Sequence, residues 1–424
     1  MIGVVLVMSA AALALGLVAV VTTDAEASAD STTDHHSMDG MATDGPMNGT
    51  TKHSMDGMEM PMDGHASGTA TTGDMEMPES GSPDPGSDTP TDDSAEMGSG
   101  PMGGHGSASA NDGLSGHGAG VSSSGIPDAT ESTGGQLLAP RIDADGALNY
   151  ELVAKPVRWE ILPGVRVTAF TYNGTVPGPQ LRVPYGKRVR VVVRNELSEP
   201  TSVHWHGLAV PNAMDGVSGV TQDAIAPGQT FTYEFDAIPA GRDSQGGTFF
   251  YHSHTMEDRQ VGLGMAGSLV IEPPTPTDQY DVEQTLMLGE WLLDPSTGET
   301  RPPMQMDGAF PNYFTINGKS FPSTETLSVN RGDRVLLRVI GAGQFNHPMH
   351  LHGTDFEVVA IDGHPVEGTP ERRDTIDIAP GQRFDLAFTA TEPGQWLFHC
   401  HIGHHLTNDG NDPGGLITLI DVKP

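Results

Sequence analysis

The chain has 424 residues, a formal net charge of −34 and a single cysteine. One cysteine excludes an intramolecular disulfide framework, and a surface this acidic argues against nucleic acid or anionic lipid as a partner. The length is enough for two or three domains.

The first 27 residues form an apolar segment that ends in small residues. The run MIGVVLVMSAAALALGLVAVV carries no charged side chain and has about the length of a signal sequence or membrane anchor. Ala25-Glu26-Ala27 fits a cleavage site, whereas basic residues before the apolar run are missing, and the first one is Lys52. Cleavage and retention as an anchor both stay open. Either one predicts that the body of the protein lies outside the cytoplasm.

Residues 28–139 form an acidic tail rich in glycine, serine, methionine and histidine. The tail contains too few large apolar residues to bury the surface that folding requires, and it is therefore predicted to be disordered. The hexapeptide HSMDGM occurs twice, beginning at His36 and at His53. Thioether and imidazole groups suit cuprous copper. The tail is therefore either a copper-capturing segment or a solvated linker.

From residue 140 the pattern changes to short β-branched runs separated by glycine turns. RVRVVVRNEL (188–197) and RVLLRVI (334–340) are typical of strands. YNGTVP at 172–177 returns as INGKSFP at 316–322, and LRVPYGKRVRVVV returns as LSVNRGDRVLLRV. Such an internal repeat predicts an all-β protein with two copies of one β-sandwich, at residues 140–276 and 277–424.

The same repeat places two His-x-His pairs in each half of the body. In a strand, residues i and i+2 share a face, so each pair presents two imidazoles on one side. Eight imidazoles suit a cluster of several copper ions, whereas one zinc ion is usually satisfied by four ligands. The pairs are His204 and His206, His252 and His254, His350 and His352, and His399 and His401.

Cys400 lies between His399 and His401, so its side chain points to the opposite face of the strand. A thiolate with two imidazoles is the trigonal arrangement of blue copper. His347 and His405 are available as the imidazoles. The predicted second metal centre therefore lies on the other face of the strand that carries the histidine pair.

The first half of the body carries no such thiolate centre. The positions that match His347, Cys400 and His405 there are Thr201, Ser253 and Asp258. This set has no thiolate, so a blue centre is predicted in the second half only.

The motifs HWHG, YHSH, HPMHLHG and HCHIGHH resemble the four copper motifs of the multicopper oxidases, the family of laccases and bacterial copper oxidases. The resemblance covers about residues 145–424. It implies cupredoxin-like Greek-key sandwiches and four copper ions per active unit. It implies that His347, Cys400 and His405 hold type 1 copper, that His204 and His350 hold type 2 copper, and that the binuclear type 3 copper is held by His206, His252, His254, His352, His399 and His401.

The interval between His254 and His347 is too short for a third domain between the two sandwiches. The chain is therefore similar to the two-domain members of the family, with type 1 copper in the second domain. Those members form trimers, in which each trinuclear cluster lies between the first domain of one subunit and the second domain of its neighbour. The resemblance implies a homotrimer here.

Two further residues take a role from the resemblance. Asp215 in NAMDGV is similar to the family's carboxylate near the trinuclear cluster, where it would relay protons; the alternative is a simple turn residue before Gly216. Leu416 in GGLITLI matches the axial position of type 1 copper after a lengthened loop. A leucine cannot coordinate, so the reduction potential is expected to be high.

The expected function is oxidation of phenolic or aromatic donors, or of Cu(I), coupled to four-electron reduction of O₂ to water. The Met/His tail favours a role in copper tolerance. Two alternatives stay open. A copper-binding or storage protein would not need Cys400 beside the histidine pair. A copper nitrite reductase resembles this chain less well, because it carries blue copper in its first domain and lacks the full histidine set.

Overall fold

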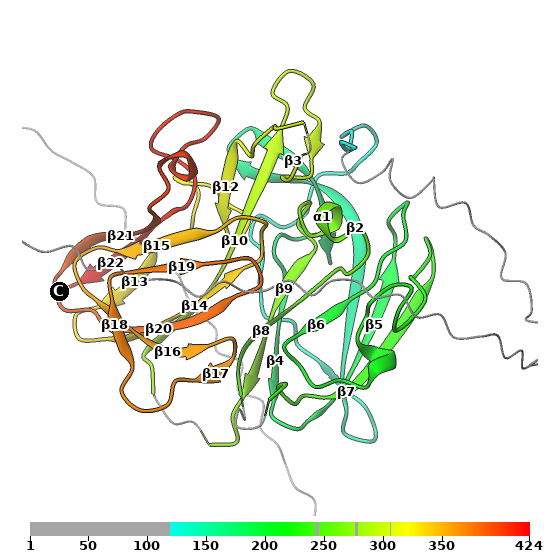
Figure 1. Ribbon diagram of the computed structural model, residues 1–424, viewed down its shortest axis with the longest axis horizontal. Coiled ribbons are helices and arrows are strands. Elements are labelled where there is room, and N and C mark those ends of the chain that lie inside the picture. The colour runs from blue at the N-terminus through cyan, green and yellow to red at the C-terminus, as the bar shows by residue number, and fades with distance from the viewer. Residues whose placement is uncertain (1–118, 242–245, 276–278, 306) are drawn as a thin grey trace, which may run out of the picture. The chain divides into compact units, whose positions relative to one another are not determined.

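The computed structural model describes residues 119–241, 246–275, 279–305 and 307–424. The apolar segment 1–27 and the tail up to residue 118 lie outside these described residues, so their predicted roles stay predictions. Within the described residues, no helix is both long and apolar enough to span a bilayer. Strands are the main regular elements of this part of the chain and helices are few and short, which confirms the all-β prediction (Figure 1).

The first sandwich consists of two sheets. One has the order β1-β2-β5-β7, with β3 also paired to β2, and the other has the order β4-β9-β8-β6. The non-consecutive neighbours show that the chain crosses between sheets, as in Greek-key folds. The strands are β1 (Arg141–Ile142), β2 (Leu148–Leu162), β3 (Val165–Tyr172), β4 (Gly178–Pro184), β5 (Arg188–Asn195), β6 (His204–His206), β7 (Thr230–Asp236), β8 (Gly247–His252) and β9 (Ala266–Glu272).

The second sandwich has a sheet in the order β11-β10-β14-β20-β16-β17, with β12 and β18 as side branches, and a sheet in the order β13-β22-β21-β15-β19. Its strands are β10 (Val282–Leu293), β11 (Thr300–Arg301), β12 (Tyr313–Ile316), β13 (Leu327–Asn330), β14 (Arg334–Gly341), β15 (His347–Leu351), β16 (Phe356–Ile361), β17 (His364–Pro365), β18 (Glu371–Arg373), β19 (Thr375–Ile378), β20 (Arg383–Thr389), β21 (Gly394–Cys400) and β22 (Ile417–Lys423). The described helices are short: 3-10 helix η1 (Asn212–Met214), α1 (Glu257–Gln260) and 3-10 helix η2 (Gly403–Leu406).

The pairing of strands repeats between the two sandwiches, as the sequence repeat predicts. β2 runs parallel to β5 in the first, as β10 does to β14 in the second. The histidine strands repeat in register as well: His204 on β6 pairs with His252 on β8, and His350 on β15 pairs with His399 on β21. Each sandwich therefore presents its two His-x-His pairs from neighbouring antiparallel strands.

The repeated Asn-Gly dipeptide forms the same turn in both halves. Asn173 and Asn317 have left-handed backbones, with φ of 58° and 50°. Each asparagine accepts a hydrogen bond from a strand N–H through its side-chain oxygen, from Val153 at 2.6 Å and from Met287 at 2.8 Å. Asparagine tolerates this conformation and glycine follows it without strain, which explains why the dipeptide marks both repeats.

The two sandwiches pack on each other through apolar and charged contacts. Trp159 of β2 lies in one buried cluster with Trp291 of β10. Thr248 of β8 donates a hydrogen bond at 2.5 Å to Asp385 of β20, whose other carboxylate oxygen contacts Arg338 at 2.6 Å. A buried carboxylate needs such partners, so this network fixes one sandwich against the other.

The described part of the chain includes residues 119–139, before the predicted boundary at residue 140. The carbonyl of Ala119 accepts a hydrogen bond from Arg259. Backbone pairing of a segment with the free edges of strands depends on tertiary structure, which composition alone does not reveal. Three isolated bridges hold the segment: Val121 with Thr300, Asp128 with Arg158, and Leu137 with Gln180.

Candidate metal centres

His347, Cys400 and His405 converge at the end of the second sandwich. Their donor atoms all lie within 4.8 Å of one another, and all three side chains are buried. The Nδ1 atoms of the two histidines are 3.1 Å apart, and Sγ of Cys400 is 3.5 Å from Nδ1 of His405. The structure thus brings together the three residues of the predicted thiolate centre. This donor set, two imidazoles and a thiolate, has the composition of a blue-copper site.

Strand neighbours provide this convergence. Cys400 ends β21, while His347 begins β15, the strand paired beside it. His405 follows in η2, and its ring stacks on Phe314 with centroids 4.2 Å apart. The backbone N–H of Ile402 donates a hydrogen bond to Sγ of Cys400 at 3.5 Å. The centre is therefore assembled from two adjacent strands and the turn that follows one of them.

Glu290 on β10 is the outer partner of His347, and no motif in the sequence predicts this contact. Its carboxylate accepts a hydrogen bond from Nε2 of His347 at 2.6 Å, and both side chains are completely buried. The second carboxylate oxygen accepts a bond from the backbone N–H of Gln344 at 3.0 Å. Glu290 therefore fixes the ring so that Nδ1 faces Cys400 and His405.

Burial sets the protonation of the free donors. It raises the pKa of the Cys400 thiol to about 11. It lowers the pKa of His405 to about 3, with neighbouring His347 and His404 adding to the effect. At neutral pH the imidazole of His405 therefore has a lone pair available, whereas the thiol gives up its proton only when a metal binds.

Leu416 lies beside this centre, where the sequence places the axial position. Its side chain is fully buried, its N–H donates to the carbonyl of His405 at 2.9 Å, and its carbonyl accepts from Cys400 N–H at 3.0 Å. The lengthened loop before it is held by Asn408, which accepts a hydrogen bond from the hydroxyl of Ser320 at 2.5 Å and donates one to the carbonyl of Phe321 at 2.7 Å.

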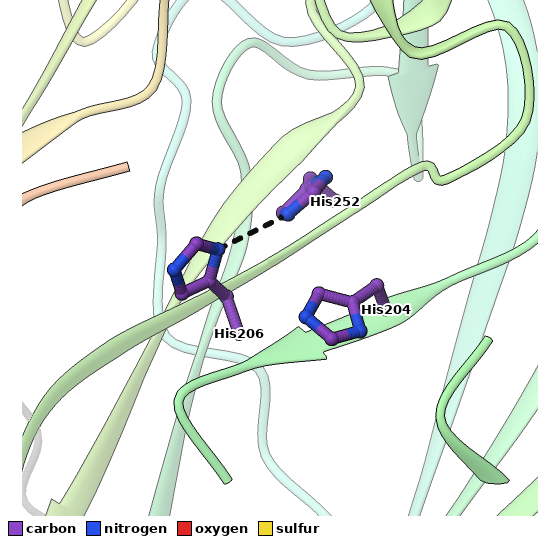
Figure 2. A group of neighbouring side chains, drawn as sticks. All are labelled: His204, His206 and His252. Atoms are coloured by element: carbon purple, nitrogen blue, oxygen red, sulfur yellow. Dashed lines mark hydrogen bonds between the residues drawn. The ribbon is translucent and has the colours of Figure 1, made fainter. Parts of the chain in front are cut away.

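The first sandwich gathers four histidines on one face of β6 and β8. His204, His206 and His252 have donor nitrogens within 4.8 Å of one another (Figure 2). Nδ1 of His206 lies 3.3 Å from Nε2 of His252. The ring of His254 completes the group, 5.5 Å from the ring of His204. We call these four residues the first histidine group.

The second sandwich gathers the matching four. His350, His399 and His401 have donor nitrogens within 4.8 Å of one another. His352 joins them, with its Nε2 at 2.9 Å from Nε2 of His399. We call these four residues the second histidine group. Cys400 points away from it into the buried core of the second sandwich, as strand alternation predicts.

Backbone carbonyls orient corresponding histidines in the two groups. Nδ1 of His204 bonds to the carbonyl of Asp215 at 2.7 Å, and Nδ1 of His350 bonds to the carbonyl of Asp374 at 2.9 Å. His252 and His399 each bond to the carbonyl of the next residue, at 2.9 and 2.8 Å. A ring that donates from Nδ1 keeps Nε2 free for a metal, which is the usual outer arrangement of histidine ligands.

The two groups form separate clusters in the described part of the chain. The ring contacts among these eight histidines join members of the same group, and none joins a member of the first group to a member of the second. In Figure 1, β6 and β15 belong to different sandwiches. Each group is also open to solvent in part, since His254 is 35% exposed and His401 is exposed.

Asp215 lies beside the first histidine group. Its carboxylate is 3.4 Å from Nδ1 of His204, and its side chain is 33% exposed. It also ends η1 before Gly216, whose φ is 85°. Its position is compatible with both interpretations from the sequence, so proton relay stays a prediction.

A residue of the second sandwich supports the first histidine group. Phe250 stacks on the ring of His206 with centroids 4.5 Å apart, and the guanidinium of Arg383 lies 5.9 Å from the centroid of Phe250. Burial, assisted by the charge of Arg383, lowers the pKa of His206 to about 3. Burial also lowers the pKa of His252, to about 4. At physiological pH both rings are therefore neutral, and each can offer a nitrogen lone pair to a metal ion.

The first sandwich contains no second thiolate centre, since Cys400 is the one cysteine of the chain. Thr201 and Ser253 do lie together, with hydroxyl oxygens 3.4 Å apart. The repeat alignment predicts Asp258 as their third neighbour, but the structure places Gln260 there. The alignment misses this because α1 brings its last residue inward, and a short helix has no counterpart in a strand-to-strand register.

Two family models, both described as Multicopper oxidase, match the chain over residues 154–276 and 297–410. The chain belongs to the multicopper oxidase family. Multicopper oxidases bind copper, and the histidine and cysteine groups described above fit that metal.

Named relatives agree with this family. Multicopper oxidase MmcO of Mycobacterium tuberculosis is 30% identical over 282 residues, which cover 59% of this chain and 54% of that protein. Copper resistance protein A of Pseudomonas syringae pv. tomato is 43% identical over 284 residues, covering 56% and 45%. This multicopper oxidase thus spans about half the length of the curated relatives it matches. The crystal structure of the blue copper oxidase from Nitrosomonas europaea shares 36% identity at a TM-score of 0.59, over 65% of this chain and 85% of that one.

Proposed function

We propose that this protein oxidises phenolic or aromatic donors, or Cu(I), one electron at a time and passes four electrons to O₂, which takes up four protons to give two waters. The observation that carries the proposal is β21, on which Cys400 faces one candidate centre while His399 and His401 face another. Copper, when bound, would supply electron acceptance at the first centre and O₂ reduction at the second.

The residues of the chain define a short path between these functions. Cys400 is covalently bonded through the backbone to His399 and His401, so electrons need no diffusing carrier between the centres. Donors would approach the side of η2, where His405 is the ligand nearest the surface turn. His405 is 6% exposed, and His347 is fully buried.

Proton supply is proposed for Asp215. Its carboxylate lies between solvent and the first histidine group, and it contacts the outer nitrogen of His204. A carboxylate placed in this way can take protons from water and deliver them toward the face where O₂ is reduced.

Subunit assembly is proposed to complete the O₂-reducing cluster. One chain holds the first and second histidine groups apart, and each group contributes four of the eight predicted ligands. A homotrimer in which the first group of one subunit meets the second group of its neighbour would unite them. Closed cyclic assemblies repeat one heterologous contact, which is the contact that this arrangement needs.

A mixing experiment tests this assembly. A variant carrying His204→Ala and His206→Ala lacks half of the first group, and a variant carrying His399→Ala and His401→Ala lacks half of the second. Each is expected to be inactive alone, and subunits mixed after dissociation are expected to regain oxygen uptake, since some interfaces combine two intact groups. No recovery in mixed trimers shown to contain both variants would contradict a shared cluster.

Oxygen uptake with defined donors tests the activity itself. We expect one O₂ consumed for four molecules of a phenol or of Cu(I) oxidised by one electron each. Copper bound without oxygen uptake would favour a storage protein, and nitrite turnover without oxygen would favour a nitrite reductase. The comparison of a phenol with Cu(I) also shows which donor class is preferred.

A role in copper tolerance and a location outside the cytoplasm are part of the proposal. The Met/His tail and the apolar segment 1–27, both outside the described residues, support them, as does the likeness to a protein named for copper resistance. Cell fractionation with an antibody tests the location. Growth of a deletion strain at rising copper concentration tests the role in tolerance.

A further inference from the structure

The position in the first sandwich that corresponds to the Cys400 centre is filled by one buried amide. His204 pairs with His252 as His350 pairs with His399, so Ser253 occupies the place of Cys400. Thr201, Ser253 and Gln260 surround this place, and all three are 0% exposed. What stands between the strands here is the side chain of Gln260.

Every hydrogen-bonding position of this amide is used. Its oxygen accepts from the hydroxyl of Ser253 at 2.5 Å and from that of Thr201 at 2.8 Å. Its nitrogen donates to the carboxylate of Glu199 and to the carbonyl of Pro200, both at 2.8 Å. A fully satisfied buried amide has one orientation, because any rotation leaves polar atoms without partners.

These four bonds connect the two segments that carry the first histidine group. Residues 199–201 lead directly into β6 with His204 and His206. Ser253 lies between His252 and His254. Gln260 itself ends α1, which begins shortly after His254. The amide therefore cross-links the chain on both sides of the group while touching none of its imidazoles.

We propose that Gln260 is a positioning residue for the first histidine group. Its hydrogen bonds join the segments of Thr201 and Ser253. The corresponding segments of the second sandwich carry His347 and Cys400, which a metal would join. This inference rests on the proposed function in taking the four histidines as copper ligands. Partners that hydrogen-bond a metal ligand directly change metal affinity by roughly 10- to 100-fold when removed, and Gln260 acts one residue further out, so a smaller loss is expected.

Gln260→Met tests the inference, because it keeps the volume of the side chain and removes all four bonds. We expect copper affinity at the histidine groups to fall by up to roughly tenfold, measured by competition with a chelator. The copper–thiolate absorption of the Cys400 centre, in the other sandwich, is expected to stay unchanged as an internal reference. Gln229→Met, at an exposed position, is the matched control. Unchanged affinity at the histidine groups would overturn the proposal.

A triple variant separates positioning from simple stability. Gln260→Met combined with Ser253→Ala and Thr201→Val also removes the two hydroxyls that lose their amide acceptor in the single variant, so thermal stability should return toward that of the parent. Copper affinity should stay low, since the cross-link is still missing. Recovery of copper affinity together with stability would show that Gln260 only supports folding and would overturn the proposal. A parent protein that binds no copper at the histidines would instead overturn the proposed function, whatever the variants do.

Discussion

Glu290 and His347 form a hydrogen-bonded pair in which neither side chain is exposed to solvent. The carboxylate comes from β10 in one sheet of the second sandwich, and the imidazole from β15 in the other. The ring that faces Cys400 is therefore held from behind by the opposite sheet. A buried carboxylate at this distance also places negative charge near the predicted copper, where it favours the more highly charged Cu(II) state.

Replacing this carboxylate should raise the reduction potential of the blue centre. Glu290→Gln keeps an oxygen that accepts from His347 but removes the charge, so Cu(II) loses more stabilisation than Cu(I). Affinity for Cu(II) is expected to fall by roughly tenfold. A redox titration that follows the blue absorption measures the change. Glu325→Gln, at an exposed position of the same sandwich, should leave the potential unchanged. A lowered potential in Glu290→Gln would refute the electrostatic role.

Removing the thiolate should disrupt one of the two candidate centres on β21 and leave the other intact. Cys400→Ser is expected to abolish the blue absorption and the oxidation of donors, because the thiolate is both the source of the colour and the link to the histidines. Copper bound by the histidine groups should remain, since these imidazoles face away from Cys400. Metal analysis and electron paramagnetic resonance of the variant measure both properties. Loss of all copper would contradict the assignment of two faces.

The copper-free protein should lose stability in acid because three buried histidines resist protonation. The pKa values of His206 and His405 are lowered to about 3, and that of His252 to about 4, chiefly by burial. Unfolded histidines titrate near 6.5. Below about pH 6.5 the unfolded state therefore binds more protons, and the free energy of unfolding falls by up to about 1.4 kcal/mol per pH unit for each histidine.

Urea unfolding of copper-free protein between about pH 7 and pH 4 measures this slope. His405→Gln removes one of these groups and should flatten the slope. A slope that is identical in the variant would show that other groups control acid stability. The same substitution at half-buried His364, which lies outside this set, is the control, and it should leave the slope unchanged.

Two deletions should distinguish the role of the tail from that of the structured segment that follows it. Deleting residues 28–118 is expected to leave phenol oxidation and thermal stability intact, because the described fold begins at residue 119. Deleting residues 28–135 also removes the bridge of Val121 with Thr300 and the ion pair of Asp128 with Arg158, and should lower the melting temperature. Activity per folded molecule measures any catalytic role. A folded but inactive shorter deletion would show that the tail takes part in catalysis.

Much of the fold follows from the sequence because the repeat constrains it twice. The Asn-Gly turns, the β-branched runs and the His-x-His pairs recur in one order, and strand alternation places Cys400 opposite its neighbouring histidines. Local periodicity is enough for these features, since each depends on residues adjacent along one strand.

The outer partners could not be predicted in the same way. Glu290 lies in a strand without a motif, and its contact with His347 exists only when two sheets pack face to face. Gln260 replaces Asp258 because the helix turn decides which side chain points inward. Whether the two histidine groups meet in one chain likewise depends on how the sandwiches pack and not on their separation in the sequence.

The central position of β21 in its sheet limits how far the distance between the two candidate centres can change during evolution. β15 and β22 flank this strand on its two edges, so ladder hydrogen bonds hold the backbone that runs through His399, Cys400 and His401 from both sides. Consecutive Cα atoms are about 3.8 Å apart in any trans peptide. The span between the two centres is thus set by covalent geometry. Substitutions in loops, on the surface and at residues that face the donor can accumulate without altering that span, so donor preference can diverge while the proposed electron transfer between the centres is preserved.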